Sequence, residues 1–285
     1  MQARYRMTSL DRTVPALGRR AMLQRAGLAL LGVALGGCGG GGGGPPPPPM
    51  QGSLDTRSIT SNINGNTYPL NIYLPPASAG PRSGLPVVYA LDGDTWFDIL
   101  VDIAESSHAH AIIVGIGNSR ALRNTDYVPV NLCTPNGGGE VAFLDFIRRE
   151  LTPYVETTIG GDPARRVLLG HSHGGSFVLY ALFAQAPADH HFSAYLSSDA
   201  SIGCMPSTVS AWDQAYATVY TELPVRLHMS YATGGNIEAN VSFIQVLQGR
   251  HYARLDMQQQ SYPGSHTGII PAAFADAIAF AIAIA

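Results

Sequence analysis

The chain has 285 residues, enough for one large domain or two small ones. Its formal net charge is −3 and only 13% of its residues are charged. The sequence has no basic stripe that could neutralise the phosphates of a nucleic acid, so nucleic-acid binding is excluded as its main role.

The first 50 residues have the composition of an export and tethering segment. Arg19-Arg20 precede an apolar stretch at residues 26–35. That stretch is too short to span a bilayer and is typical of an export signal, here similar to a twin-arginine signal. Leu35-Gly36-Gly37-Cys38 resembles a bacterial lipobox, although Gly36 stands where Ala or Ser is more usual. We therefore expect residues 1–37 to direct export and Cys38 to be lipidated, with an ordinary secretory signal as the alternative.

A low-complexity tether follows. Six glycines, residues 39–44, precede five prolines, residues 45–49. The glycine run predicts a flexible chain and the proline run a stiff spacer, and neither can form a core. We expect residues 38–50 to hold a domain, residues 51–285, at a membrane of the bacterial cell envelope, on its periplasmic or surface side.

Apolar runs and turn signals predict alternating strands and helices in that domain. Asn64-Gly65 predicts a hairpin. Continuous Val- and Ile-rich runs at 86–91 and 111–116 are typical of strands buried on both faces of a parallel sheet. Further strands are expected at 166–169, 192–197, 225–232 and 254–261, and helices at 95–108, 140–155, 176–182, 237–247 and 271–284. The alternation predicts a single α/β domain whose mostly parallel sheet is flanked by helices. The last helix is short and contains Asp276, which favours a buried helix over a membrane span.

One pentapeptide carries the strongest functional signal. Gly170-His171-Ser172-His173-Gly174 lies between a predicted strand and a predicted helix. In that context G-x-S-x-G is typical of a nucleophile elbow, which lifts a serine hydroxyl above the edge of the sheet. Ser172 is the candidate nucleophile. The alternative is a structural turn in a chain that has 32 glycines.

A serine hydroxyl needs a base, and the base needs an acid to hold it. In this arrangement the order along the chain is Ser, then Asp or Glu, then His. His266 lies in a turn-rich loop after the last predicted strand and is the expected base. Glu238, which follows the strand at 225–232, is preferred as the acid. Asp199, after the strand at 192–197, is the alternative acid.

The negative charge formed during acyl transfer needs two backbone N–H donors. One is expected from His173, the residue after the serine. The other is expected from Asp94 or Gly93, in the loop after the strand at 86–91. Asp92 and Asp94 with one glycine do not complete a calcium loop, so we predict neither a metal nor another cofactor.

Two cysteines remain in the domain, Cys133 and Cys204. An even pair in a chain bound for an oxidising compartment could form a disulfide. Two separate buried thiols are the alternative.

With these residues in place, the chain resembles the esterase family of α/β-hydrolases that includes siderophore esterases, S-formylglutathione hydrolases and acetyl- or feruloyl-xylan esterases. The resemblance covers nearly all of the domain and rests on residues 86–93, 113–118, Arg123, 126–129, 170–175, Gly235 with Glu238, and 264–266. His173 departs from the family, which commonly has Leu, Met or Tyr at this position.

The resemblance implies an α/β-hydrolase fold and a serine esterase that forms an acyl-enzyme on Ser172 and releases it with water. The expected substrate is a small-molecule or glycan-linked ester. Two other functions are open: acyl transfer by the same three residues, and non-catalytic ligand binding by a surface lipoprotein. The sequence leaves the oligomeric state undetermined.

Overall fold

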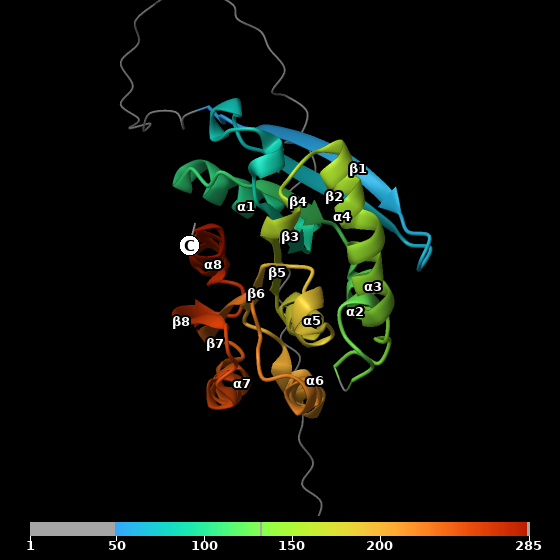
Figure 1. Cartoon of the computed structure of the whole chain (residues 1–285), viewed down its shortest axis with the longest axis vertical. Coiled ribbons are helices and arrows are strands. Elements are labelled where there is room, and N and C mark those ends of the chain that lie inside the picture. Colours follow the sequence, from blue (N-terminus) through green and yellow to red (C-terminus); the bar gives the residue numbers. More distant parts are fainter. Residues whose placement is uncertain (1–48, 132, 284–285) are drawn as a thin grey trace, which may run out of the picture. The chain divides into compact units, whose positions relative to one another are not determined.

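Eight strands form one sheet in the order β1-β2-β4-β3-β5-β6-β7-β8 (Figure 1). The structure is a computed structural model that describes residues 49–131 and 133–283. The expected export signal, Cys38 and most of the tether lie outside these residues. Within the described ranges, no helix combines the length and the apolar character needed to cross a membrane.

The sheet is mostly parallel, as predicted. β1 pairs antiparallel with β2 and β2 antiparallel with β4, whereas every other neighbouring pair is parallel. The strands are β1 (Ser53–Thr60), β2 (Thr67–Leu74), β3 (Val87–Leu91), β4 (Ile112–Ile116), β5 (Arg166–His171), β6 (Ala194–Ser198), β7 (Arg226–Gly234) and β8 (Asp256–Ser265). The antiparallel hairpin predicted at Asn64-Gly65 joins β1 to β2.

Helices cover both faces of the sheet. They are α1 (Gly93–Ser107), α2 (Arg120–Asp126), α3 (Glu140–Phe146), α4 (Thr152–Thr158), α5 (His173–Phe183), α6 (Pro206–Val219), α7 (Ile237–Arg250) and α8 (Ile270–Ile282). α1 and α8 pack on one face, and α3 to α7 pack on the other. The helix predicted at 140–155 is interrupted by one π-helical turn, Ile147–Leu151, between α3 and α4.

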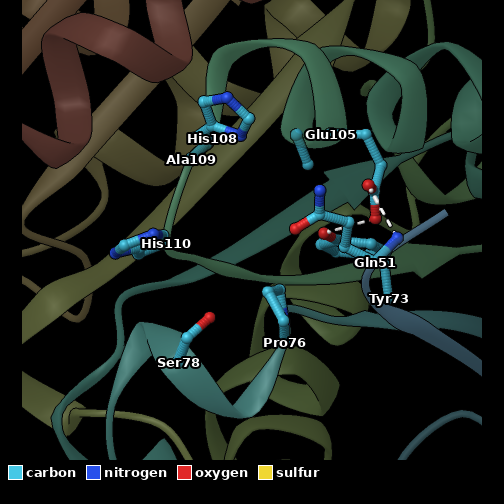
Figure 2. A pocket seen from close by; sticks show the side chains of 9 residues that line it. Gln51, Tyr73, Pro76, Ser78, Glu105, His108, Ala109 and His110 are labelled. Atoms are coloured by element: carbon cyan, nitrogen blue, oxygen red, sulfur yellow. Dashed lines mark hydrogen bonds between the residues drawn. The ribbon is translucent and has the colours of Figure 1, made fainter. Parts of the chain in front are cut away.

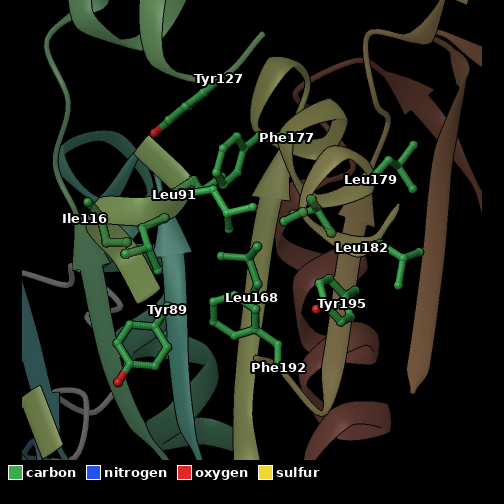
Figure 3. Packing of buried hydrophobic residues seen from close by; sticks show 14 of the residues in the cluster. Tyr89, Leu91, Ile116, Tyr127, Leu168, Phe177, Leu179, Leu182, Phe192 and Tyr195 are labelled. Carbon is green, nitrogen blue, oxygen red and sulfur yellow. The ribbon is translucent and has the colours of Figure 1, made fainter. Parts of the chain in front are cut away.

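Burial on both faces explains the continuous apolar runs. In β3, Val88 and Ala90 belong to the cluster under α1 and α8, whereas Tyr89 and Leu91 belong to the opposite cluster. Figure 3 shows the Leu91 side chain pointing toward Phe177 of α5 on that opposite side. Because successive side chains of a strand point to opposite faces, both faces must be apolar, and the alternating pattern of a half-exposed strand is absent from β3.

The chain enters the sheet at the edge where the parallel strands begin. Glu105, near the end of α1, accepts the backbone N–H of Gln51 (3.0 Å) and the hydroxyl of Tyr73 (2.9 Å) (Figure 2). It also accepts the backbone N–H of Gly52 (2.8 Å). β1 then starts beside the last residue of β2. Ser172 lies at the opposite end of the strands, where the parallel strands have their carboxyl ends.

Candidate active site

The backbone at Ser172 has the geometry of a nucleophile elbow. Ser172 follows β5 directly and precedes α5, with φ 61° and ψ −121°. Residues with a side chain rarely adopt this conformation, which costs on the order of 1–3 kcal/mol. A Cβ at Gly170 would collide with the backbone of Gly174, so the tight turn needs glycine at position 170. The Ser172 N–H donates to the carbonyl of Ser198 (3.0 Å), which fixes the elbow against β6.

A histidine and an aspartate lie at the same edge of the sheet. His266 follows β8, and its Nδ1 is 2.6 Å from Oδ2 of Asp199, the residue after β6. The Asp199 side chain is fully buried. Its Oδ1 accepts the backbone N–H groups of Ala232 (3.3 Å) and Asn236 (3.1 Å). This carboxylate is therefore held by the main chain on one side and faces the imidazole on the other.

Glu238, the preferred acid, does not contact His266 in the structure, whereas Asp199, the alternative acid, does. Glu238 lies in the first turn of α7 and lines a separate groove with Ile202 and Pro206. The loop between β7 and α7 was expected to carry the acid. Asn236 in this loop donates its backbone N–H to Asp199 instead, and a Cβ at Gly235 would collide with the Asp199 carboxylate.

A second histidine packs against His266. The ring centroids of His171 and His266 are 4.4 Å apart. Nδ1 of His171 lies 3.2 Å from Oγ of Ser198, within hydrogen-bond distance. Burial, with a smaller contribution from the nearby His266, lowers the pKa of His171 to about 3. His171 is therefore neutral near pH 7 and adds no positive charge beside His266.

Ser172 and His266 line the same cavity, which has a volume of about 340 Å³. Its other lining residues are Asp92, Asp94, Thr95, Trp96, Asn118, Arg123, His171 and Thr267. Nε of Arg123 is 2.7 Å from Oδ1 of Asp92. Burial raises the pKa of Asp92, and the adjacent Arg123 opposes that rise. The charge of Arg123 is thus balanced by a buried carboxylate, and exposed Asp94 adds negative charge at the cavity.

The residues expected to stabilise an oxyanion occupy helix starts. Gly93 and Asp94 open α1, and His173 opens α5. Backbone N–H groups in the first turn of a helix have no carbonyl partner within that helix. Helix starts of this kind attract negative charge, and Asp94 lines the same cavity as Ser172.

Ser201 also lies beside the candidate nucleophile, although the sequence pattern does not predict it. Its hydroxyl oxygen lies 3.1 Å from that of Ser172, within hydrogen-bond distance. No motif marks this residue, which lies two positions after Asp199 in the segment between β6 and α6. Only the fold brings it to the nucleophile.

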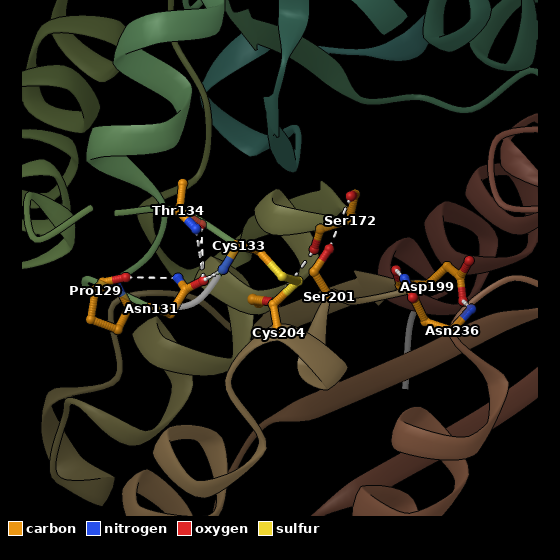
Figure 4. Close-up of a disulfide and its surroundings, with 10 residues drawn as sticks. Pro129, Asn131, Cys133, Thr134, Ser172, Asp199, Ser201, Cys204 and Asn236 are labelled. Carbon is orange, nitrogen blue, oxygen red and sulfur yellow. Dashed lines mark hydrogen bonds between the residues drawn. A yellow bond between two sulfur atoms is a disulfide. The ribbon is translucent and has the colours of Figure 1, made fainter. Parts of the chain in front are cut away.

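The two cysteines of the domain form a disulfide, and one of them, Cys204, lies in this segment (Figure 4). Cys133 and Cys204 are 71 residues apart in sequence, and their Cα atoms are 5.6 Å apart.

Across residues 49–131 and 133–283, no group of three or more His, Cys, Asp or Glu side chains is placed to hold a metal ion.

Three features define this fold as an α/β-hydrolase with a serine nucleophile elbow. They are the parallel sheet, the strained serine between β5 and α5, and the histidine–aspartate pair after β8 and β6. Within that class the family is shown by sequence. A family model described as "Putative esterase" matches residues 61–262, more than half of the chain, and the chain belongs to this family.

Similar proteins agree with this assignment. The chain is 35% identical over 136 residues to the siderophore triacetylfusarinine C esterase of Aspergillus fumigatus, a match that covers 42% of this chain and 46% of that protein. It is 28% identical over 172 residues to the ferri-bacillibactin esterase BesA of Bacillus subtilis, covering 52% and 58% respectively. These matches span about half the length of the curated relatives. Among solved structures, an IroE-like serine hydrolase from Shewanella oneidensis superposes with a TM-score of 0.71 and 26% identity, over 79% of each chain.

Proposed function

We propose that this protein is a serine hydrolase of carboxylic esters that acts through a Ser172–His266–Asp199 triad. One observation carries the proposal: His266 is hydrogen-bonded to a buried carboxylate and lines the same cavity as a serine on a nucleophile elbow. Membership of the esterase family and the similarity to a serine hydrolase of the same fold support it.

The proposed reaction has two steps. Oγ of Ser172 bonds to the ester carbonyl carbon while Nε2 of His266 takes the serine proton. The carbon–oxygen bond to the alcohol then breaks, and the alcohol leaves with that proton. A water molecule attacks the acyl-enzyme, gives a proton to His266 and releases the acid as Ser172 regains its proton. Asp199 holds the Nδ1–H tautomer of His266 and stabilises its positive form.

The tetrahedral intermediates carry a negative oxygen that needs donors. We assign these to the backbone N–H groups of His173 and of Asp94 or Gly93, at the starts of α5 and α1. Because only the main chain is required, the unusual imidazole at position 173 leaves this role intact.

We propose a small-molecule ester of the siderophore type as the substrate class. The two curated relatives described above have siderophore esterase names, and the cavity of about 340 Å³ has the size of a small-molecule site.

We further propose export and lipidation at Cys38. The lipobox-like sequence, the Gly/Pro tether and the Cys133–Cys204 disulfide support this location. Partition in Triton X-114 tests it: the wild type should enter the detergent phase and Cys38→Ser the aqueous phase. A variant that still enters the detergent phase would count against lipidation.

The catalytic proposal is tested with p-nitrophenyl esters of several acyl lengths. Ser172→Ala should abolish turnover and labelling by a fluorophosphonate, while the circular dichroism spectrum stays that of the wild type. Ser210→Ala, which removes an exposed hydroxyl from α6, is the matched control and should keep full activity. A folded wild type that hydrolyses none of these esters and resists the fluorophosphonate would refute the proposal.

A further inference from the structure

We propose that Ser201 is a positioning residue for Ser172 and that the Cys133–Cys204 disulfide holds Ser201 in place. This inference rests on the proposed ester hydrolysis, because it concerns how the nucleophile of that reaction is oriented.

Two contacts join Ser201 to the nucleophile. Its backbone N–H donates to the carbonyl of Ser172 (3.1 Å), and its Oγ lies 3.1 Å from Oγ of Ser172. Ser201 is only 7% exposed, so water competes little for this hydroxyl. When the Ser201 hydroxyl donates to Ser172 Oγ, the Ser172 proton is left for another acceptor, His266. The contact therefore fixes the Ser172 rotamer and leaves its proton available to the base.

The disulfide lies three residues beyond Ser201. Cys204 ends the short turn Ile202–Cys204, and its N–H donates to the carbonyl of Ser201 (3.1 Å). Its partner Cys133 is in the segment between α2 and α3, where Asn131 Oδ1 accepts the N–H groups of Cys133 (2.9 Å) and Thr134 (3.0 Å). Figure 4 shows Ser201 between the disulfide and Ser172. The disulfide thus ties the Ser201 segment to the segment between α2 and α3 that contains Cys133.

Asp199 is anchored independently of the disulfide. Its carboxylate accepts N–H groups from Ala232 and Asn236, and its carbonyl accepts the side-chain amide of Asn236 (3.1 Å). Opening the disulfide should therefore loosen Ser201 while the Asp199–His266 pair stays in place. Cys133 is exposed, so a small reductant can reach the bond. Dithiothreitol converts the disulfide to two thiols by giving it two electrons and two protons, and is itself oxidised to its cyclic disulfide.

The test compares wild type and Ser201→Ala, each oxidised and reduced. We measure kcat and KM with a p-nitrophenyl ester and the rate of Ser172 labelling by a fluorophosphonate. Loss of one hydrogen bond should lower kcat and the labelling rate about threefold to tenfold in Ser201→Ala, with KM nearly unchanged. Ser201→Thr, which keeps the hydroxyl, should retain most of the activity, and Ser210→Ala should match the wild type.

The effect of reduction separates positioning from general stability. Reduction should slow the wild type by a similar factor but should slow Ser201→Ala no further, because the contact is already lost. Circular dichroism and thermal melting confirm that all four samples are folded at the assay temperature. Equal slowing of both proteins by reduction, or no slowing of the wild type, would overturn the role of the disulfide.

The labelling rate distinguishes failure of this inference from failure of the proposed function. A wild type that is labelled, together with Ser201→Ala labelled at the same rate, overturns the inference alone. A wild type that is neither labelled nor active on any ester overturns both.

Discussion

Replacing Asp199 by asparagine tests the central contact of the site with little change in shape. The Asp199 carboxylate is fully buried and lies 2.6 Å from Nδ1 of His266. Asparagine has nearly the same volume and can still accept the N–H groups of Ala232 and Asn236 through its side-chain oxygen. What is lost is the negative charge that faces the imidazole. The variant should therefore fold and should fail in the reaction.

The size of the loss follows from this geometry. A hydrogen bond to a charged group contributes about 1.5–3 kcal/mol, which corresponds to a rate loss of roughly tenfold to 150-fold. An asparagine amide that turns its NH₂ toward His266 also selects the wrong tautomer, which in serine proteases raises the loss to about 10⁴. We therefore expect kcat of Asp199→Asn to fall about 10²- to 10⁴-fold, with a small change in KM.

Glu238→Gln is the matched control, since it makes the same chemical change at the acid that the sequence favoured. Glu238 lines the groove beside Ile202 and not the cavity of Ser172, so its kcat should stay within about twofold of the wild type. The assay is steady-state hydrolysis of a p-nitrophenyl ester by both variants, with folding checked by circular dichroism. Near-normal kcat in Asp199→Asn together with a large loss in Glu238→Gln would refute the reasoning.

Two further predictions concern pH and substrate charge. His228 is fully buried in β7, neither of its ring nitrogens has a hydrogen-bond partner in the structure, and burial lowers its pKa to about 4. Because the unfolded chain binds this proton below about pH 6.5, stability should fall as the pH drops from 6.5 toward 4, by roughly 2 kcal/mol at pH 5 from this residue. Urea titrations at pH 7 and pH 5 should show a smaller difference for His228→Leu, and an equal difference would contradict this origin. Asp94 is exposed at the cavity, so Asp94→Asn should raise kcat/KM for mono-p-nitrophenyl succinate relative to neutral p-nitrophenyl butyrate about threefold at low salt. Asp98→Asn, also exposed on α1, is the control, and the same rise in that variant would show that the effect is not local to the cavity.

The sequence was sufficient for the parts of the site that lie in regular structure. The apolar run before Gly170 and the helical spacing after it defined the elbow, because strand, turn and helix each leave a local pattern. His266 could be placed by its position after the last strand. Both judgements depend on order along the chain, which sequence records directly.

The contact between His266 and Asp199 depends on how two loops meet, which the sequence does not record. Asp199 and Glu238 each follow a strand, so chain order allowed both. What separates them is the end of β7 and the turn after it, where the N–H groups of Ala232 and Asn236 donate to the Asp199 carboxylate. Asp199 also has a positive φ of 39°, a conformation that aspartate tolerates better than most residues. That preference is too weak to identify an acid from sequence.

Ser201 and the disulfide were beyond sequence reasoning for a related reason. An even number of cysteines allows a disulfide, but the sequence does not show how close the two residues lie. The 5.6 Å between their Cα atoms is a property of the fold. A single serine in an irregular segment has no periodicity to mark it. Contacts between irregular segments could therefore not be predicted from one sequence.

The backbone at Ser172 has a consequence for engineering this protein. Its φ of 61° is one that glycine adopts without strain, so this serine costs stability in return for its hydroxyl. Variants selected only for a higher melting temperature would therefore accept glycine at position 172, and the most heat-resistant of them would be inert. Selection for a more heat-stable variant therefore has to include an assay of the proposed ester hydrolysis at every round. At position 172, stability favours glycine whereas the reaction needs serine.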